Sequence, residues 1–184
     1  MVMAPATSTK LTYEDYLLLP EDGRRHEIID GEHYVTPAPL FRHQQIALSL
    51  AYAFRTHLAP SRAGVVIVAP FDVVLSESDV VQPDVMFVRT ERRHIIRPKN
   101  IDGAPDLVIE ILSESSRQRD LTIKRKLYES AGVAEYWLVD PDDERVTIYR
   151  REAGTFLPRD AGDVITTPLL PGFTLPRADV FAMP

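Results

Sequence analysis

Residues 107–140 contain two apolar runs separated by a helical pattern, and this succession limits the fold more than any other feature. The runs 107–112 and 135–140 have the length and composition of strands buried on both faces. Between them, the segment 121–131 has helical periodicity and is followed by Gly132, a typical helix C-terminal residue. A strand, a helix and a strand in about 35 residues form a crossover unit, so we expect the two strands to be parallel neighbours.

Upstream of this unit, turn residues and apolar spacing predict the remaining elements. Thr12 is suited to cap a short helix over YEDYLLL, which Pro20 ends. The Asp-Gly dipeptide at 30–31 is a hairpin turn between the strand-like segments RHEIID and EHYVTP. Helical spacing covers about 41–58, and GVVIVAP, FDVVL and VVQPDVMFV are predicted strands, the last with Pro83 at an edge or a strand entrance.

These elements predict a single α/β domain over residues 1–184, built on a mixed β-sheet flanked by helices, with an N-terminal helix and hairpin. We place the core at about 24–150 and a C-terminal extension, rich in proline and glycine, at about 154–184. No internal repeat or low-complexity linker divides the chain, and its length suffices for one hydrophobic core.

The sequence contains no cysteine, which excludes disulfides, thiolate nucleophiles and zinc–thiolate sites. No apolar run approaches the roughly 20 residues that cross a bilayer, and MVMAPATSTK lacks the pattern of a secretory signal, so we expect a cytoplasmic protein with no membrane partner. The net charge of −6 argues mildly against a protein that coats nucleic acid. The basic segments 89–99 and 117–126 are explained most simply as solvated loops and helix faces.

Two charged residues interrupt the apolar pattern of the crossover unit. Glu110 lies in the middle of the first strand, where an unpaired charge costs several kcal/mol or more. On a helical wheel, Lys124 falls within about 60° of the apolar stripe that should face the sheet, and Asp120 lies on the same side. The residues of that stripe are Leu121, Leu127, Tyr128 and Ala131. The two charges can therefore meet at the end of the sheet, although a buried ion pair that only locks the crossover explains them equally well.

Asp84 is a third charged residue on an apolar strand candidate, VVQPDVMFV. Two carboxylates and a lysine in one crevice are suited to cleaving phosphodiesters. Mg²⁺ prefers oxygen ligands and often takes one or two protein carboxylates, with waters and substrate phosphate. A nearby lysine can orient the attacking water, help to deprotonate it or stabilise developing charge. Taken alone, Asp84 is explained better as a strand-entry residue that caps a turn after a proline.

The segments QPDVMFV, PDLVIEILSESS and RDLTIKRKLYESAGVAEYWLVDP together resemble the Uma-type restriction endonuclease family, within the PD-(D/E)XK nuclease-like superfamily. The resemblance runs from HEIIDGEHYVTPAP to EYWLVDPDDERVTIYR. It implies a nuclease-like α/β core, a divalent metal, which we take to be Mg²⁺ with Mn²⁺ able to substitute, and DNA as the substrate.

The resemblance also assigns roles to particular residues. Asp84 matches the first metal-binding carboxylate and Glu110 the second. The superfamily pattern expects a lysine two residues after the second acid, where this chain has Leu112. In the family, the lysine usually lies in the following helix, and Lys124 matches that position. Glu27 matches the acidic residue that the N-terminal element often contributes, with an ordinary hairpin residue as the alternative.

Four further residues have open roles. Ile111 is expected to offer its main-chain carbonyl to the metal. His43 is predicted either to reach the crevice or, more simply, to be a surface or capping residue. Tyr128 is predicted to hydrogen-bond into the site or, more simply, to be a half-buried core residue. Asp120 is predicted to orient the lysine or to cap its helix.

We therefore expect a Mg²⁺-dependent endonuclease acting on DNA. A homodimer is compatible with cutting both strands of a duplex, although no segment encodes a recognisable dimer interface. The main alternative is a non-catalytic relative that binds nucleic acid or a protein and keeps the charges as a structural cluster. Hydrolysis of another phosphate ester has less support, because no glycine-rich nucleotide-binding loop is present.

Overall fold

The central six-stranded sheet is built around the parallel pair predicted from residues 107–140. The structure, a computed structural model, describes residues 10–183, so residues 1–9 of the segment examined for a secretory signal lie outside it. In spatial order the strands are β11 (Thr155–Asp160), β10 (Arg145–Glu152), β9 (Glu135–Asp140), β8 (Leu107–Ile111), β6 (Val85–Arg89) and β3 (Gly64–Val68). Strands β8 and β9 are parallel, which confirms the crossover, and the other neighbours are antiparallel.

A five-stranded sheet carries the predicted N-terminal hairpin. In spatial order its strands are β2 (Glu32–Thr36), β1 (Arg25–Ile29), β5 (Asp79–Val81), β4 (Asp72–Ser76) and β7 (Asn100–Asp102). The hairpin strands β1 and β2 are antiparallel around the turn at 30–31, as predicted. In the C-terminal segment, β12 (Val164–Ile165) pairs with β13 (Leu175–Pro176). The prediction of an α/β fold with a mixed sheet flanked by helices is confirmed.

Helices form at the three predicted places, although the third begins at Arg117 and not at about 121, and the helices at Thr90–Ile95 and Arg177–Phe181 are additions to the prediction. They are α1 (Tyr13–Tyr16), α2 (Phe41–Ser61), the 3-10 helix η1 (Thr90–Ile95), α3 (Arg117–Arg119), the π-helical turn η2 (Asp120–Lys124), α4 (Arg125–Ala131) and α5 (Arg177–Phe181). Thr12 caps α1 in a capping box, and Gly132 ends α4 in the left-handed conformation. None of the described helices combines the length and apolarity that a membrane span requires.

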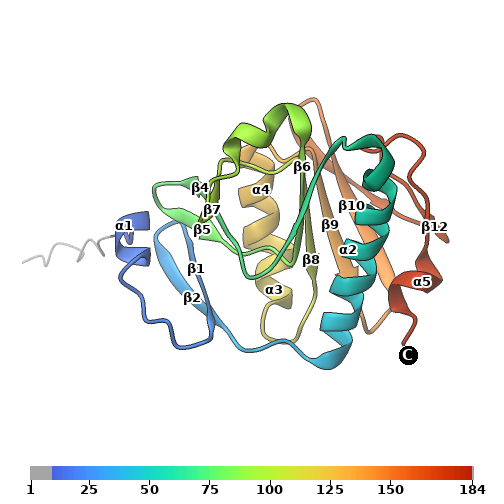
Figure 1. Ribbon diagram of the computed structural model, residues 1–184. Coiled ribbons are helices and arrows are strands. Elements are labelled where there is room, and N and C mark those ends of the chain that lie inside the picture. Colours follow the sequence, from blue (N-terminus) through green and yellow to red (C-terminus); the bar gives the residue numbers. More distant parts are fainter. Residues whose placement is uncertain (1–9, 184) are drawn as a thin grey trace, which may run out of the picture.

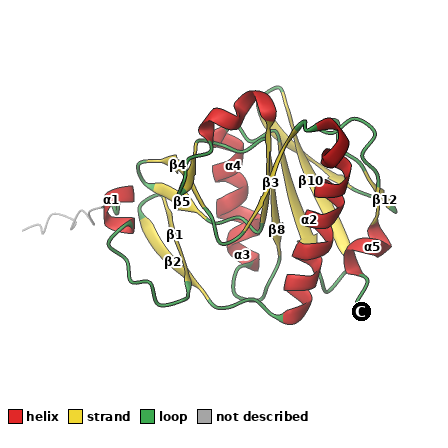
Figure 2. Cartoon of the chain, in the orientation of Figure 1, coloured by secondary structure: helices red, strands yellow, loops and turns green. Residues whose placement is uncertain are grey.

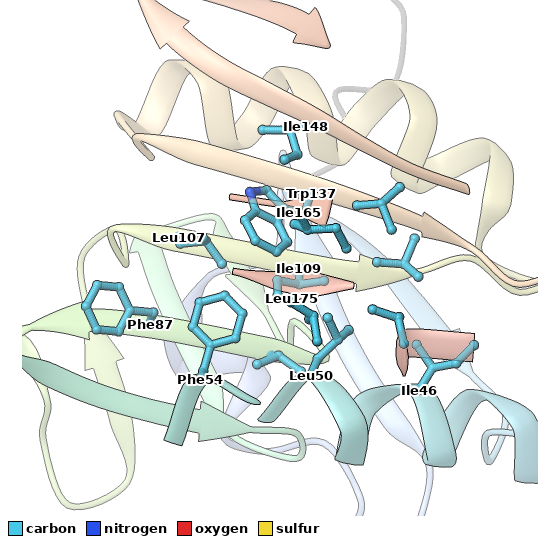
Figure 3. Packing of buried hydrophobic residues seen from close by; sticks show 14 of the residues in the cluster. Ile46, Leu50, Phe54, Phe87, Leu107, Ile109, Trp137, Ile148, Ile165 and Leu175 are labelled. Carbon is cyan, nitrogen blue, oxygen red and sulfur yellow. The ribbon is translucent and has the colours of Figure 1, made fainter. Parts of the chain in front are cut away.

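Apolar side chains cover both faces of the six-stranded sheet. On one face, α2 packs against alternate residues of the strands, as Figure 3 shows for Phe54, Leu107 and Trp137. The opposite face packs against α4 and the five-stranded sheet. Figure 1 shows α2 and α4 on opposite sides of the central strands. Successive residues of β8 alternate between these faces, so Glu110 points to the side of α4.

The π-helical turn η2 changes the orientation of one residue from that predicted by the helical wheel. Lys124 and Asp120 are buried, as the wheel predicts, but Leu121 is exposed. A wheel assumes 3.6 residues per turn, whereas hydrogen bonds in a π-helix span five residues and widen the turn. The prediction that Leu121 faces the sheet is therefore wrong.

Candidate active site

Glu110 lies on the face of β8 that packs against the helix over 117–131, and its carboxylate is buried there. Lys124, the last residue of η2, donates from Nζ to Glu110 Oε1 over 3.0 Å. The hydroxyl of Tyr128, one turn later in α4, donates to the same oxygen over 2.7 Å. The three side chains are 2% exposed or less, so a buried charged group joins the strand to the helix that follows it.

Lys124 contacts two further carboxylates. Its Nζ lies 2.8 Å from Glu27 Oε1 and 3.6 Å from Asp120 Oδ1. Glu27 is on β1, in the other sheet, so this ammonium group links the two sheets. Among the described residues, Glu27 Oε2 and Asp120 Oδ1 are buried without a hydrogen-bond donor, although Arg119 lies 3.7 Å from the former. One lysine is therefore shared by Glu110 and two other acids.

Asp84 precedes β6 and is held beside Glu110 by a main-chain hydrogen bond. Its Oδ2 accepts from the amide of Ile111, the residue after Glu110, over 2.8 Å. Its Oδ1 accepts from Arg25 Nη1 over 2.9 Å, and His43 Nε2 lies 3.1 Å from Oδ2. Strand β1, the start of α2 and the end of β8 therefore meet at this carboxylate.

Asp84, Glu110 and Lys124 line one cavity of about 510 Å³. Its walls include the linker between β2 and α2, residues 37–40, and the loop after β8, residues 113–116. This volume is within the roughly 300–1,000 Å³ that is usual for ligand pockets. The three charged groups that the sequence predicts to converge therefore share one pocket.

Burial and shared charge perturb the protonation of this cluster. Burial raises the pKa of Glu110 to about 8, with Lys124 opposing the rise and the neighbouring carboxylates adding to it. Burial also raises the pKa of Asp120. For Lys124, burial acts to lower the pKa, but Glu110, Glu27 and Asp120 outweigh it and hold the pKa above its ordinary value. At neutral pH the lysine is therefore charged and Glu110 readily holds a proton.

The pKa of Asp84 is displaced in the opposite direction. Burial opposes ionisation, but His43, Arg25 and the amide of Ile111 outweigh it and hold the pKa of this carboxyl below its usual value. The cavity therefore contains one carboxylate that stays ionised and a second, Glu110, that is easily protonated. Such a separation between neighbouring acids is typical of functional sites.

Asp84 and Glu110 are the buried carboxylates that this cavity offers to a cation, and Glu114 adds an exposed carboxylate to its wall. Within residues 10–183, no group of three or more His, Asp or Glu side chains is arranged to hold a metal ion. Mg²⁺ commonly takes one or two protein carboxylates and keeps several waters, so a pair of acids is a fitting donor set. Within the part of the chain that the structure describes, the two side chains that hydrogen-bond to Glu110 both do so at Oε1, so Oε2 is the oxygen that can act as a ligand.

Comparison with known proteins places the chain in a family. The family model Uma2, described as "Putative restriction endonuclease", matches residues 13–178. This chain belongs to the Uma2 family. Among solved structures, the crystal structure of a putative nuclease belonging to DUF820, from Anabaena variabilis ATCC 29413, matches with a TM-score of 0.78. The sequences are 24% identical, and the match covers 93% of this chain and 97% of that chain.

That likeness shows a shared fold, which agrees with the nuclease-like α/β core that the sequence resemblance implies. No curated protein matches the sequence. Uma2 membership and the fold together indicate a restriction-endonuclease-like nuclease. The predicted family is therefore confirmed.

The four charged residues predicted for the site of this Uma2 protein lie together. Asp84, Glu110 and Lys124 line the same cavity. Glu27 forms an ion pair with Lys124 behind that cavity, so it is not explained as an ordinary hairpin residue. Ile111 also lines the cavity, but its amide rather than its carbonyl contacts Asp84. A ligand role for the carbonyl of Ile111 stays a prediction, as do the catalytic roles of the other four.

Arg25 is a site residue that the sequence analysis missed. It forms the ion pair with Asp84, and it precedes Glu27 by two positions on β1. Alternate residues of a strand share a face, so this spacing is the signal that could have identified Arg25. For His43, the structure supports the prediction that it reaches the crevice, because its ring contacts Asp84.

The structure also shows how Tyr128 and Asp120 are placed. Tyr128 donates to Glu110, as one alternative predicts, and it is also a core residue, although it is fully buried and not half-buried. Asp120 lies beside Lys124, and the helical segment begins earlier, at Arg117, so Asp120 does not cap it.

Proposed function

We propose that this Uma2-family protein is a Mg²⁺-dependent endonuclease that hydrolyses DNA phosphodiester bonds in the cavity around Asp84 and Glu110. The observation that carries the proposal is the placement of both carboxylates and Lys124 around one cavity, with the acids linked through the amide of Ile111. This arrangement supplies hard oxygen ligands next to a fixed positive charge, which is what phosphodiester hydrolysis requires.

Asp84 and Glu110 are the proposed ligands of Mg²⁺, with the main-chain carbonyl of Ile111 as a third, and Mn²⁺ is expected to substitute. The ion would lower the pKa of the attacking water and screen the negative charge of the transition state. Arg25 and His43 hold Asp84 in its ionised, ligand-competent state.

Lys124 acts in this proposal as a permanent cation. Because Glu110, Glu27 and Asp120 hold its pKa above the ordinary value, it is a poor proton acceptor at neutral pH. It therefore donates hydrogen bonds that position the attacking water or stabilise developing charge, and does not deprotonate that water. Glu27 and Asp120 orient the ammonium group from behind.

The direct test is incubation of supercoiled plasmid DNA with the protein in Mg²⁺, in Mn²⁺ and in EDTA. We expect nicked or linear DNA with either ion and intact plasmid in EDTA. Linear DNA formed without a nicked precursor would indicate two paired active sites, as in a homodimer. Intact plasmid under all three conditions would contradict the proposal.

The affinity for Mg²⁺ is expected to rise with pH up to about 8. Glu110 must release its proton to become a ligand, so the affinity should increase by about tenfold per pH unit below that value and level off above it. Calorimetric titration in two buffers of different ionisation enthalpy measures both the affinity and the protons released. The Glu110→Gln variant should lose this dependence, and a flat profile for the wild type would exclude Glu110 as a ligand.

A second candidate function is binding without catalysis. It is favoured by the contacts of Asp84, whose two oxygens already accept from Arg25 and Ile111 and lie against His43. In that case Glu110 and Lys124 serve as a structural cluster. The protein would then bind DNA or a protein partner, and titration with Mg²⁺ or Mn²⁺ would give no binding heat.

A further inference from the structure

Two further cavities lie along α2 and strand β3, and one of them adjoins the active-site cavity. This second cavity, of about 490 Å³, shares His43 and Asp84 with the first. A third cavity of about 330 Å³ lies beside Gly64, the first residue of β3. Strand β3 is an edge of the six-stranded sheet, and α2 packs against it (Figure 2).

One face of α2 lines both of these cavities. The residues of α2 are Gln44, Ala47, Leu48 and Ala51 in the second cavity and Arg55, Leu58 and Ala59 in the third, which Arg62, the residue that caps the helix, also lines. Steps of three or four residues keep these side chains on one side of the helix. Strand β3 follows the same course, with Val68 in the second cavity and residues 64–66 in the third. The two cavities therefore follow one another along α2 and β3, and we call the surface that contains both of them the α2–β3 groove.

Three arginines surround the third cavity: Arg55, Arg62 and Arg93. In the part of the chain that the structure describes, none of them has a carboxylate within ion-pair distance, whereas the neighbouring Arg92 pairs with Asp106 at 3.1 Å. Acidic residues outnumber basic ones in this chain, by 27 to 21. Unpaired arginines that converge on one cavity of an acidic protein indicate an anionic ligand.

The walls of the third cavity, which we call the arginine cavity, are held in place by hydrogen bonds between η1 and the end of α2. Thr90, the first residue of η1, donates from Oγ1 to the carbonyl of Arg62 over 2.6 Å, and its amide donates to Ala63 O over 3.0 Å. These bonds hold η1 against the end of α2, which brings Arg93 to the cavity that Arg55 lines. The site is therefore assembled from two elements before any ligand arrives.

The distance from His43 to Arg55 along α2 gives the length of nucleic acid that the groove would span. Arg55 follows His43 by 12 positions, which corresponds to about 18 Å along α2 at 1.5 Å per residue. DNA advances 3.4 Å per base pair along its helix axis, so this length corresponds to about five base pairs of a duplex whose axis is parallel to α2. The side chains of α2 between these points that line the second cavity carry no charge: Gln44, Ala47, Leu48 and Ala51.

We infer that the α2–β3 groove carries the substrate's backbone and that Arg55, Arg62 and Arg93 bind its phosphates about five base pairs from the cleaved bond. The position of the cleaved bond rests on the proposed nuclease function, whereas the phosphate contacts do not depend on catalysis. Phosphate contacts set the register of a duplex without reading its sequence. The arginines therefore contribute affinity and placement, and not base specificity.

The test compares two double variants of equal charge. Arg55→Gln/Arg93→Gln alters the arginine cavity, and Arg145→Gln/Arg159→Gln removes two exposed arginines from β10 and β11, at the opposite edge of the sheet. Binding of a fluorescent duplex of about 20 base pairs is measured by anisotropy without divalent metal, between about 50 and 200 mM KCl. Melting temperatures verify that both variants are folded.

We expect the cavity variant to bind the duplex roughly tenfold more weakly, and the slope of log K against log salt to fall by about 2, since each lost phosphate contact removes about 0.9. The control variant should match the wild type, and in cleavage assays KM should rise in the cavity variant with kcat unchanged. If both variants bind the duplex with the same affinity and the same salt slope, the inference that the α2–β3 groove binds DNA is contradicted, even if the wild type cleaves DNA. The predicted loss of binding in a protein that cleaves nothing would support the groove and contradict the nuclease.

Discussion

Glu110→Gln is expected to lower the rate of Mg²⁺-dependent DNA cleavage about 10³-fold while the protein stays folded. The substitution removes a proposed ligand, and a bound metal contributes several kcal/mol of transition-state stabilisation, each 1.4 kcal/mol being about tenfold in rate. The glutamine carbonyl can still accept from Lys124 and Tyr128, which preserves the buried contacts. Rates are measured on plasmid DNA at saturating Mg²⁺.

The stability of this variant separates a catalytic role for Glu110 from a structural one. Burial raises the pKa of Glu110 to about 8, so below that pH the native state favours the neutral side chain, and glutamine imitates it. We therefore expect a midpoint of urea unfolding at pH 7 equal to that of the wild type or higher. Glu21→Gln, at an exposed position, is the matched control and should leave both cleavage and stability unchanged. Undiminished cleavage by Glu110→Gln would remove this residue from the mechanism.

Asp84 is less suitable for the same test, because its substitution is expected to affect stability as well as activity. Asparagine in its place would leave the guanidinium of Arg25, whose side chain is 18% exposed, without its counter-charge. Loss of one partner from a largely buried pair is strongly destabilising, so a loss of activity would be mixed with a loss of fold. Glu110 avoids this difficulty because the neutral form is already favoured there.

Charges that break an apolar pattern are the part of the site that the sequence predicts well. Glu110 interrupts a strand, and Lys124 interrupts a helical stripe, and because these elements are consecutive their contact follows from the crossover alone. Burial without a partner is too costly for either group, so each requires the other. The hairpin and the long helix α2 are predicted for the similar reason that their signals are local.

The contacts of Asp84 could not be predicted, because they depend on how distant elements pack. Arg25 comes from the five-stranded sheet and His43 from the start of α2, and no local pattern relates either of them to Asp84. The exposure of Leu121 has a different cause, since the π-helical turn departs locally from the regular period on which the prediction rests.

The arginines of the basic segment 89–99 have different surroundings in the folded protein. Arg89 and Arg92 lie against Asp106, which agrees with the prediction of an ordinary charged surface for that part. Arg93 instead faces the cavity that Arg55 lines, from an element more than 30 positions away. Charge runs in the sequence locate arginines, but only the packing of η1 on α2 shows which of them remain unpaired.

Lys124→Met is expected to destabilise the protein by about 3–5 kcal/mol at pH 7 and to abolish cleavage. Methionine retains much of the lysine's volume but leaves Glu27, Glu110 and Asp120 without the cation that they share, and removing one partner of a buried ion pair typically costs this much. Stability is obtained from urea unfolding followed by circular dichroism.

The pH dependence of that loss shows whether the shared charge is its cause. Without Lys124, the pKa values of the buried acids rise further above their unfolded values, so the native state binds more protons than the unfolded state and the variant regains stability as the pH falls from 7 to about 5. At pH 7 the Glu110 side chain of this variant must take up a proton on folding, so adding Glu110→Gln removes that cost and should recover part of the stability. A loss that is independent of pH and is not reduced in the double variant would point to packing instead. In that case the ammonium group would not be the element that holds Glu27 of one sheet against Glu110 of the other.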